Sequence, residues 1–181
     1  MMRTRLSDSR FFAALIRLQC ALGFALLGVA HPAHAAWNNY TCSINSASLS
    51  FGTYNPLSST PLSNNSASLT VTCSNGTGSG AATPNPSIAL SSGSAASFSP
   101  RTLKSGSNSL NYNVFTESSY TTVWGDGTGS TATRSVTVNS PTGKATSSNS
   151  TSLTLYGRIP SGQLNAAAGN YSDTLTITVT Y

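Results

Sequence analysis

Apolar and polar residues alternate along several short stretches of this chain, and such alternation predicts β-strands. Residues 173–181 (DTLTITVTY) place threonines on one face of an extended strand. The opposite, apolar face carries Leu175, Ile177, Val179 and Tyr181. The same period of two recurs at residues 42–44, 66–73, 88–90, 110–114, 136–138 and 153–155. The pattern therefore predicts about seven short strands.

Turn signals separate these stretches. They include Tyr54-Asn55-Pro56, Asn75-Gly76, Pro84-Asn85-Pro86, Gly125-Asp126-Gly127 and Pro141-Thr142-Gly143. More than a third of residues 36–181 are Ser or Thr, which disfavour helices. Residues 74–86 and 145–151 are expected to be long loops. Together these features predict an all-β fold, a single antiparallel β-sandwich of the immunoglobulin-like kind.

The first 35 of the 181 residues have the pattern of a secretory signal peptide. Four arginines precede an apolar run at residues 18–30, and Ala33-His34-Ala35 offers small residues for cleavage before Ala36. The run is too short to span a bilayer comfortably. We therefore predict a leader at residues 1–35, a folded domain at residues 36–181, and an exported protein.

Removal of this leader changes the charge of the chain. Residues 36–181 keep five basic and three acidic residues, a net charge of +2, and contain no histidine. The basic residues are scattered, whereas nucleic-acid binding needs clustered Lys and Arg. We therefore expect no nucleic-acid partner.

Two cysteines remain after the leader, Cys42 and Cys73. An even pair in an exported chain predicts a disulfide, which would stabilise the fold by about 3–4 kcal/mol through loop closure. A metal site built on these two thiolates would lack a partner histidine. We expect neither a metal nor another cofactor.

The sequence offers little for catalysis. Residues 36–181 contain no histidine and therefore offer no imidazole base for a serine nucleophile. Their carboxylate side chains are Glu117, Asp126 and Asp173, and Asp126 between two glycines is typical of a turn rather than of a calcium site. Trp124 could stack on a sugar, but its position at a strand end favours the core. We predict a protein that is not an enzyme.

Two arginines lie beside strand-like segments, Arg101 and Arg158. Either could pair with Glu117 or Asp173, or face solvent. The sequence leaves these alternatives open.

The last predicted strand has an apolar, unprotected edge. Exposed strand edges invite pairing with other chains, and residues 173–181 carry neither the Lys nor the Pro that usually prevents it. Either earlier strands pair with both of its edges, or one edge is open.

Several motifs in order resemble the spore coat protein U-like family, which includes pilin subunits of archaic chaperone–usher systems. The C-terminal stretch LTLYGRIPSGQLNAAAGNYSDTLTITVTY carries the strongest resemblance. Earlier elements are Cys42 with Phe51-Gly52-x-Tyr54, Leu69-x-Val71-x-Cys73, Arg101 with Leu103, Leu110-x-Tyr112-x-Val114-Phe115, and Val123-Trp124-Gly125-Asp126-Gly127.

The resemblance implies an incomplete sandwich whose final strand comes from another chain. A periplasmic chaperone would lend that strand first, and a neighbouring pilus subunit would replace it after passage through an outer-membrane usher. This is strand addition to an open edge. Leu175, Ile177, Val179 and Tyr181 would then lie on the strand beside the acceptor groove.

One segment departs from the family pattern. Only residues 36–41 (AWNNYT) precede the first cysteine after the predicted cleavage site, and in extended form they reach roughly 20 Å. We expect such a segment to be too short and too polar to complete a neighbour. The chain would then accept a strand without donating one, as a terminal subunit or as a coat protein outside a fibre.

The leading hypothesis is a non-enzymatic subunit of a chaperone–usher pilus, exported through the periplasm to the cell surface or secreted, with a role in adhesion or biofilm formation. The alternative is a self-complete secreted adhesin or carbohydrate-binding domain, in which loops such as residues 119–133 bind the ligand.

Overall fold

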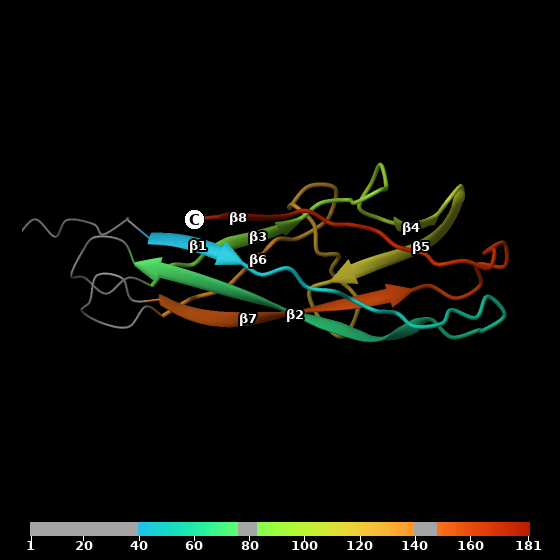
Figure 1. Ribbon diagram of the computed structural model, residues 1–181, viewed down its shortest axis with the longest axis horizontal. Coiled ribbons are helices and arrows are strands. Elements are labelled where there is room, and N and C mark those ends of the chain that lie inside the picture. Colours follow the sequence, from blue (N-terminus) through green and yellow to red (C-terminus); the bar gives the residue numbers. More distant parts are fainter. Residues whose placement is uncertain (1–39, 76–82, 140–147) are drawn as a thin grey trace, which may run out of the picture. The chain divides into compact units, whose positions relative to one another are not determined.

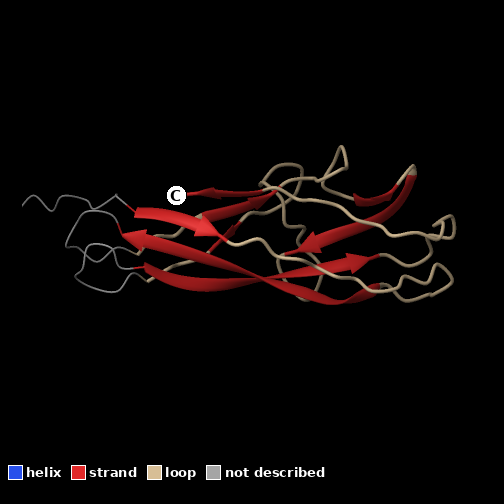
Figure 2. Cartoon of the chain, viewed as in Figure 1, coloured by secondary structure: helices blue, strands red, loops and turns tan. Residues whose placement is uncertain are grey.

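Antiparallel strands account for the regular structure of the chain. A computed structural model describes residues 40–75, 83–139 and 148–181, and every regular element in these ranges is a strand (Figure 2). The predicted signal peptide and most of the segment before Cys42 lie outside the described residues. The described ranges contain no helix able to cross a membrane. The strands are β1 (Tyr40–Ile44), β2 (Leu62–Asn75), β3 (Ser87–Leu90), β4 (Arg101–Ser105), β5 (Asn108–Phe115), β6 (Arg134–Ser135), β7 (Ser148–Ile159) and β8 (Ile177–Thr180).

The strands form two sheets with the immunoglobulin order (Figure 1). One sheet has the order β1-β2-β7-β5-β4 and the other β6-β3-β8, with antiparallel pairing throughout. In an immunoglobulin domain, strands A, B, E and D form one sheet and C, F and G the other. Here β1, β2, β7 and β5 take the places of A, B, E and D, and β3 and β8 those of C and F. The predicted immunoglobulin-like β-sandwich is confirmed.

No described strand takes the place of strand G. That place lies beside strand F, on the side of β8 away from β3. β1 is the edge strand of the larger sheet, and its first residue meets the end of the chain, with the rings of Tyr40 and Tyr181 5.5 Å apart between centroids. Beyond this contact, no described strand lies between the edge of the larger sheet and β8, so the described part of the sandwich is open on this side.

The core lies between the two sheets and is built from the predicted alternation. Trp124 is fully buried, as predicted, and its indole N–H donates to the carbonyl of Ile88 at 2.9 Å. The structure contains the predicted disulfide, because Cys42 and Cys73 face each other in the ladder between β1 and β2 with their sulfurs 2.04 Å apart. The other buried apolar residues are Leu69, Val71, Ile88, Leu90, Leu103, Leu110, Tyr112, Val114, Val136, Val138, Leu153, Leu155 and Ile159.

Two sequence predictions about strands are wrong in part. Val136 and Val138 are buried but follow the two-residue β6, and their amides donate to the carbonyls of Pro86 and Pro84. A proline has no N–H group, so Pro84 and Pro86 cannot donate the second hydrogen bond of each pair, and no regular ladder forms. Residues 148–151, expected in a loop, begin β7, and their polar, mostly exposed side chains hid the strand.

Arg101 resolves one open alternative, since it neither pairs with a carboxylate nor faces solvent. It is fully buried, and its guanidinium donates to the carbonyls of Ser91 and Trp124 and to the side-chain oxygen of Asn113, at 2.7 to 3.0 Å. Burial lowers the pKa of Arg101, and the nearby Tyr112 and Asp173 partly oppose that effect. Arg101 therefore connects β4 by hydrogen bonds to three other parts of the chain. These are β5, the segment after β3, and the loop that contains Trp124.

Glu117 organises the loop after β5. Its carboxylate accepts hydrogen bonds from the hydroxyls of Thr116 and Thr121 and from the amides of Thr121 and Thr122. These bonds, those from the two hydroxyls above all, hold the pKa of Glu117 at about 2, below its ordinary 4.5.

This pKa predicts how Glu117 contributes to stability as the pH changes. A carboxyl group whose pKa is lower in the folded state stabilises the fold above its unfolded pKa and loses that contribution as the pH falls through the folded value. The difference in stability between the wild type and Glu117→Gln should be constant above about pH 5 and shrink between pH 4.5 and 2. Urea titrations at several pH values measure it. A stability difference between the two proteins that stays constant down to pH 2 would contradict the lowered pKa of Glu117.

Candidate functional site: an open apolar cleft

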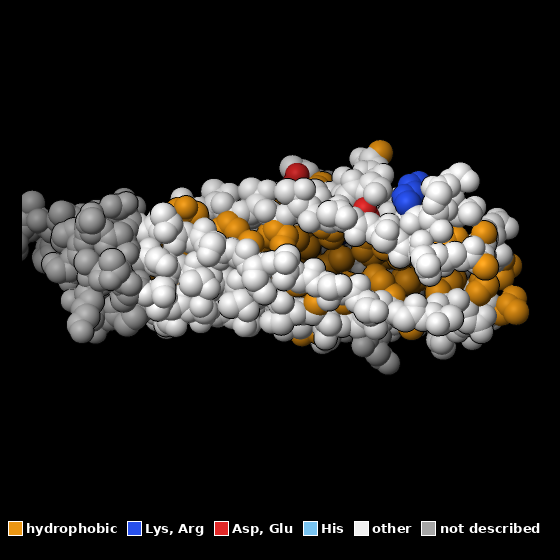
Figure 3. Space-filling model, in the orientation of Figure 1, with side chains coloured by type: hydrophobic (Ala, Val, Ile, Leu, Met, Phe, Trp, Pro, Cys, Tyr) orange, Lys and Arg blue, Asp and Glu red, His pale blue; other side chains and the backbone are white. Residues whose placement is uncertain are grey.

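A long cleft opens where strand G is missing. It encloses about 1040 Å³. Figure 3 shows its hydrophobic floor between rims of mostly uncharged polar surface. The floor includes Leu69, Leu90, Leu103, Leu110, Leu155 and Ile159. These floor residues belong to the hydrophobic core and are at most 8% exposed, so the cleft reaches the core without leaving it bare.

The first rim of the cleft is residues 46–53, which continue from β1. Their sequence alternates, with Leu49 and Phe51 half-buried against the core and the serines between them exposed. Asn45 still bonds to Thr70 of β2, but among the described residues no backbone hydrogen bond joins residues 46–53 to another segment. The first rim therefore has the side-chain pattern of a strand without a partner.

Gly157 of β7 lets the first rim lie this close to the floor. A Cβ at this position would overlap the side chains of Leu49 and Phe51. The Phe51 ring in turn meets Tyr112 edge-on, with 5.8 Å between ring centroids. Close backbone approach is a common reason for glycine inside a strand.

Gly157→Ala should therefore push the first rim away from the sheet. Overpacking of this kind typically costs about 1–3 kcal/mol, and we expect a loss of that size in the free energy of unfolding, measured with urea. Ser152→Ala, at an exposed position of the same strand, is the control and should change stability by less than about 0.5 kcal/mol. An equal loss in both variants would contradict this role of Gly157.

The second rim is residues 172–177, which lead into β8. On the side away from the cleft this rim is paired. Ser172 exchanges both backbone hydrogen bonds with Lys104, and the amide of Ser91 donates to the carbonyl of Thr176 at 3.0 Å. β8 continues with β3 on that same side, and its other edge pairs with no strand in the described ranges. Both rims thus border the cleft with strand edges that lack a partner.

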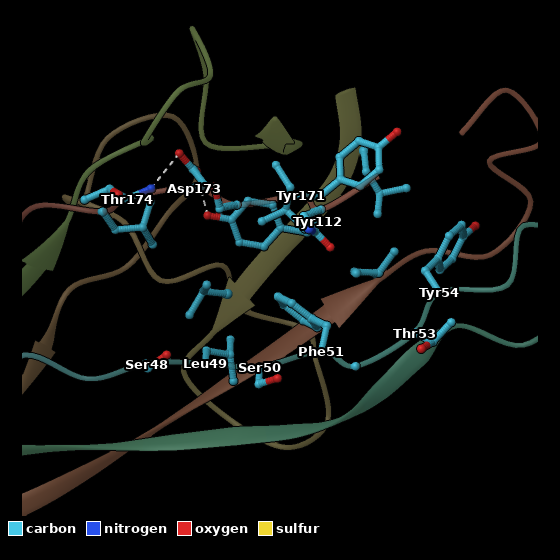
Figure 4. A pocket seen from close by; sticks show the side chains of 18 of the residues that line it. Ser48, Leu49, Ser50, Phe51, Thr53, Tyr54, Tyr112, Tyr171, Asp173 and Thr174 are labelled. Carbon is cyan, nitrogen blue, oxygen red and sulfur yellow. Dashed lines mark hydrogen bonds between the residues drawn. The ribbon is translucent and has the colours of Figure 1, made fainter. Parts of the chain in front are cut away.

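Tyrosines line one end of the cleft, and their hydroxyls form hydrogen bonds within the protein (Figure 4). Tyr54 donates to the carbonyl of Pro160, Tyr171 to that of Ala167, and Tyr112 to the Asp173 carboxylate at 2.7 Å. Burial, and then this bond to Asp173, raise the pKa of Tyr112 well above its ordinary 10.0. The cleft therefore presents ring faces, and the polar ends of the rings are already satisfied.

The four residues predicted for the acceptor strand take different positions. Leu175 and Ile177 line the cleft. Val179 is half-buried beyond its lining, and Tyr181 is 56% exposed with its ring against Tyr40. Sequence reasoning missed the first rim as a structural element, although its alternating SASLSF pattern was a readable signal.

The three carboxylates serve the local structure. Glu117 binds its own loop, Asp126 accepts bonds from the amide and hydroxyl of Thr128, and Asp173 accepts bonds at the second rim. Across the described residues, no three His, Cys, Asp or Glu side chains gather where they could hold a metal ion.

Comparison with known families supplies the identification. The chain matches the family model of the Spore Coat Protein U domain over residues 29–178. It belongs to this family. The family resemblance predicted from sequence motifs is thereby confirmed, and no match was found among curated proteins.

One solved structure is also similar, though distantly. It is the CsuC-CsuE chaperone–tip adhesion subunit pre-assembly complex from the archaic chaperone-usher Csu pili of Acinetobacter baumannii. The identity is 21% and the TM-score 0.49. The match covers 78% of this chain and 40% of the other, so it extends over less than half of that chain's length.

Proposed function

We propose that this Spore Coat Protein U domain is a structural subunit of a chaperone–usher pilus, and that its open cleft receives a β-strand from another chain. The observation that carries the proposal is the open place of strand G. In the described part of the chain, two strand edges without partners flank an apolar floor there. An extended peptide placed between the rims would find backbone partners on both sides and bury alternate side chains on the floor.

The energetics favour such a partner. Soluble monomers rarely leave a large continuous apolar surface uncovered, and this cleft is lined by core residues such as Leu103 together with the half-buried Leu175 and Ile177. Each apolar side chain that the incoming strand buries contributes about 1.5–3 kcal/mol. Filling the cleft with several such side chains is comparable to the whole stability of a small domain.

The order of partners is taken from the family resemblance, and the open surface supports it. An open cleft risks aggregation during export, so a periplasmic chaperone would fill it first, and a neighbouring subunit would replace the chaperone strand at the outer-membrane usher. The pilus would carry the subunit to the cell surface, in a mechanical role in adhesion or biofilm formation, without catalysis. That the short segment at residues 36–41 donates no strand stays a prediction.

The test is to supply the missing strand in cis. An Asn-Gly turn after Tyr181, followed by about nine residues alternating Val and Thr, would fold back along the free edge of β8. We expect this tail to raise the melting temperature by about 10 °C or more and to protect the amides of residues 46–53 from hydrogen exchange.

A matched control tail has Ser in place of each Val, with the same turn and length. It keeps the backbone donors but provides no side chains for the apolar floor, so it should stabilise far less. Equal melting temperatures for the chain without a tail, the Val tail and the Ser tail would reject the proposed function.

A further inference from the structure

Among the described residues that line the cleft, Asp173 is the only one with a charged side chain. Its Oδ1 accepts hydrogen bonds from the amide and hydroxyl of Ser94 and from the amide of Thr174, at 2.7 to 2.9 Å. Its Oδ2 accepts one bond, from Tyr112 at 2.7 Å. A carboxylate oxygen has two lone pairs, so Oδ2 keeps capacity for a further donor.

Within the described residues, the charge of this carboxylate has no ion-pair partner. All four of its donors are neutral, and no lysine or arginine in the described ranges forms a hydrogen bond with Asp173. Arg101 interacts with Asp173 only at longer range, and its guanidinium is already bonded to Ser91, Asn113 and Trp124. A strand entering the cleft would therefore meet a single negative charge, on the second rim, among described lining residues that are otherwise uncharged.

We propose that Asp173 selects the occupant of the cleft by charge. The incoming strand carries a cation or a neutral hydrogen-bond donor, and no carboxylate, at the position opposite Asp173. This inference rests on the proposed function, since it assumes that a strand enters the cleft at all.

Discrimination by charge would arise because a strand that fills the cleft expels water from around Asp173. A carboxylate on the incoming strand would face Asp173 in a site from which most water has been expelled, where repulsion is several times stronger than in solvent. A lysine would instead provide the missing counter-charge and a donor for Oδ2. Specificity built on repulsion in this way discriminates among strands of equal apolar content.

The test uses the alternating tail with the residue opposite Asp173 varied. Tails with Lys, Gln or Glu at that position are compared by melting temperature, in the wild-type chain and in Asp173→Asn. In the wild type, we expect the protein with the Lys tail to have the highest melting temperature. The protein with the Glu tail should melt at least about 3 °C lower. In Asp173→Asn, the difference in melting temperature between the Lys and Glu tails should fall to less than about a third of its wild-type value, because the repelling charge is gone.

Asp126→Asn is the control, because it removes a carboxylate from an exposed turn outside the cleft. It should leave the full difference between the Lys and Glu tails. A difference as large in Asp173→Asn as in the wild type, or no difference in the wild type, overturns this inference while the tails still stabilise. If no tail stabilises the chain, the proposed function fails, and the inference fails with it.

Discussion

Ile177→Asp is expected to abolish recovery of folded protein from the periplasm. Ile177 lies opposite Leu90 in the ladder between β3 and β8, and its side chain packs against the core where the cleft begins. An aspartate there places a charge on the surface that the two sheets and any incoming strand must bury. Burying an unpaired carboxylate costs more than a small domain can lose. Immunoblotting of the soluble periplasmic fraction measures the yield.

Thr178→Asp is the matched control, because Thr178 is the next residue of β8 and its side chain is exposed. It adds the same charge to the same strand on the solvent face, so the yield should stay close to that of the wild type. A normal yield of Ile177→Asp would contradict the assignment of this face to the core and cleft.

Arg101→Met is expected to lower the free energy of unfolding by about 3–5 kcal/mol, because buried acceptors that lose their donor cost about 1–3 kcal/mol each. Methionine fills a similar volume but leaves the carbonyls of Ser91 and Trp124 without this donor, and Asn113 Oδ1 keeps only the Val114 amide. Unpaired buried polar groups account for most of the loss. Urea unfolding followed by tryptophan fluorescence measures it, since Trp124 lies in the same network.

Arg158→Met separates this effect from the loss of a positive charge. Arg158 is half-buried and lies 5.7 Å from the Tyr120 ring centroid. Its cation–π contact is worth only about 0.5–1 kcal/mol at such a site. Losses of similar size in the two variants would show that Arg101 has no special structural role.

The fold could be predicted from the sequence because its strands alternate strictly. Leu69, Val71 and Cys73 lie two residues apart, and all three are buried in β2. The disulfide followed from an even pair of cysteines, and Trp124 from its place at a strand end. These predictions need only local patterns, which a half-buried strand imposes on its own sequence.

The site could be predicted only in part, because it depends on contacts between distant segments. Leu175 and Ile177 were found from alternation within one strand. The first rim was missed because its serines and its single glycine, Gly52, disguise a strand that lacks a partner. The roles of Arg101 and Asp173 depend on Ser91 and Ser94, residues of a loop for which the sequence gives no spacing rule.

Periplasmic expression of the full chain, with and without its cognate chaperone, tests the central claim most directly. The claim is that the sandwich is completed by a strand from another chain. Size-exclusion chromatography of the soluble fraction should then show the protein only with the chaperone, as a one-to-one complex. A stable monomer of the full chain obtained without any chaperone would contradict the claim, because the domain would then complete its own fold.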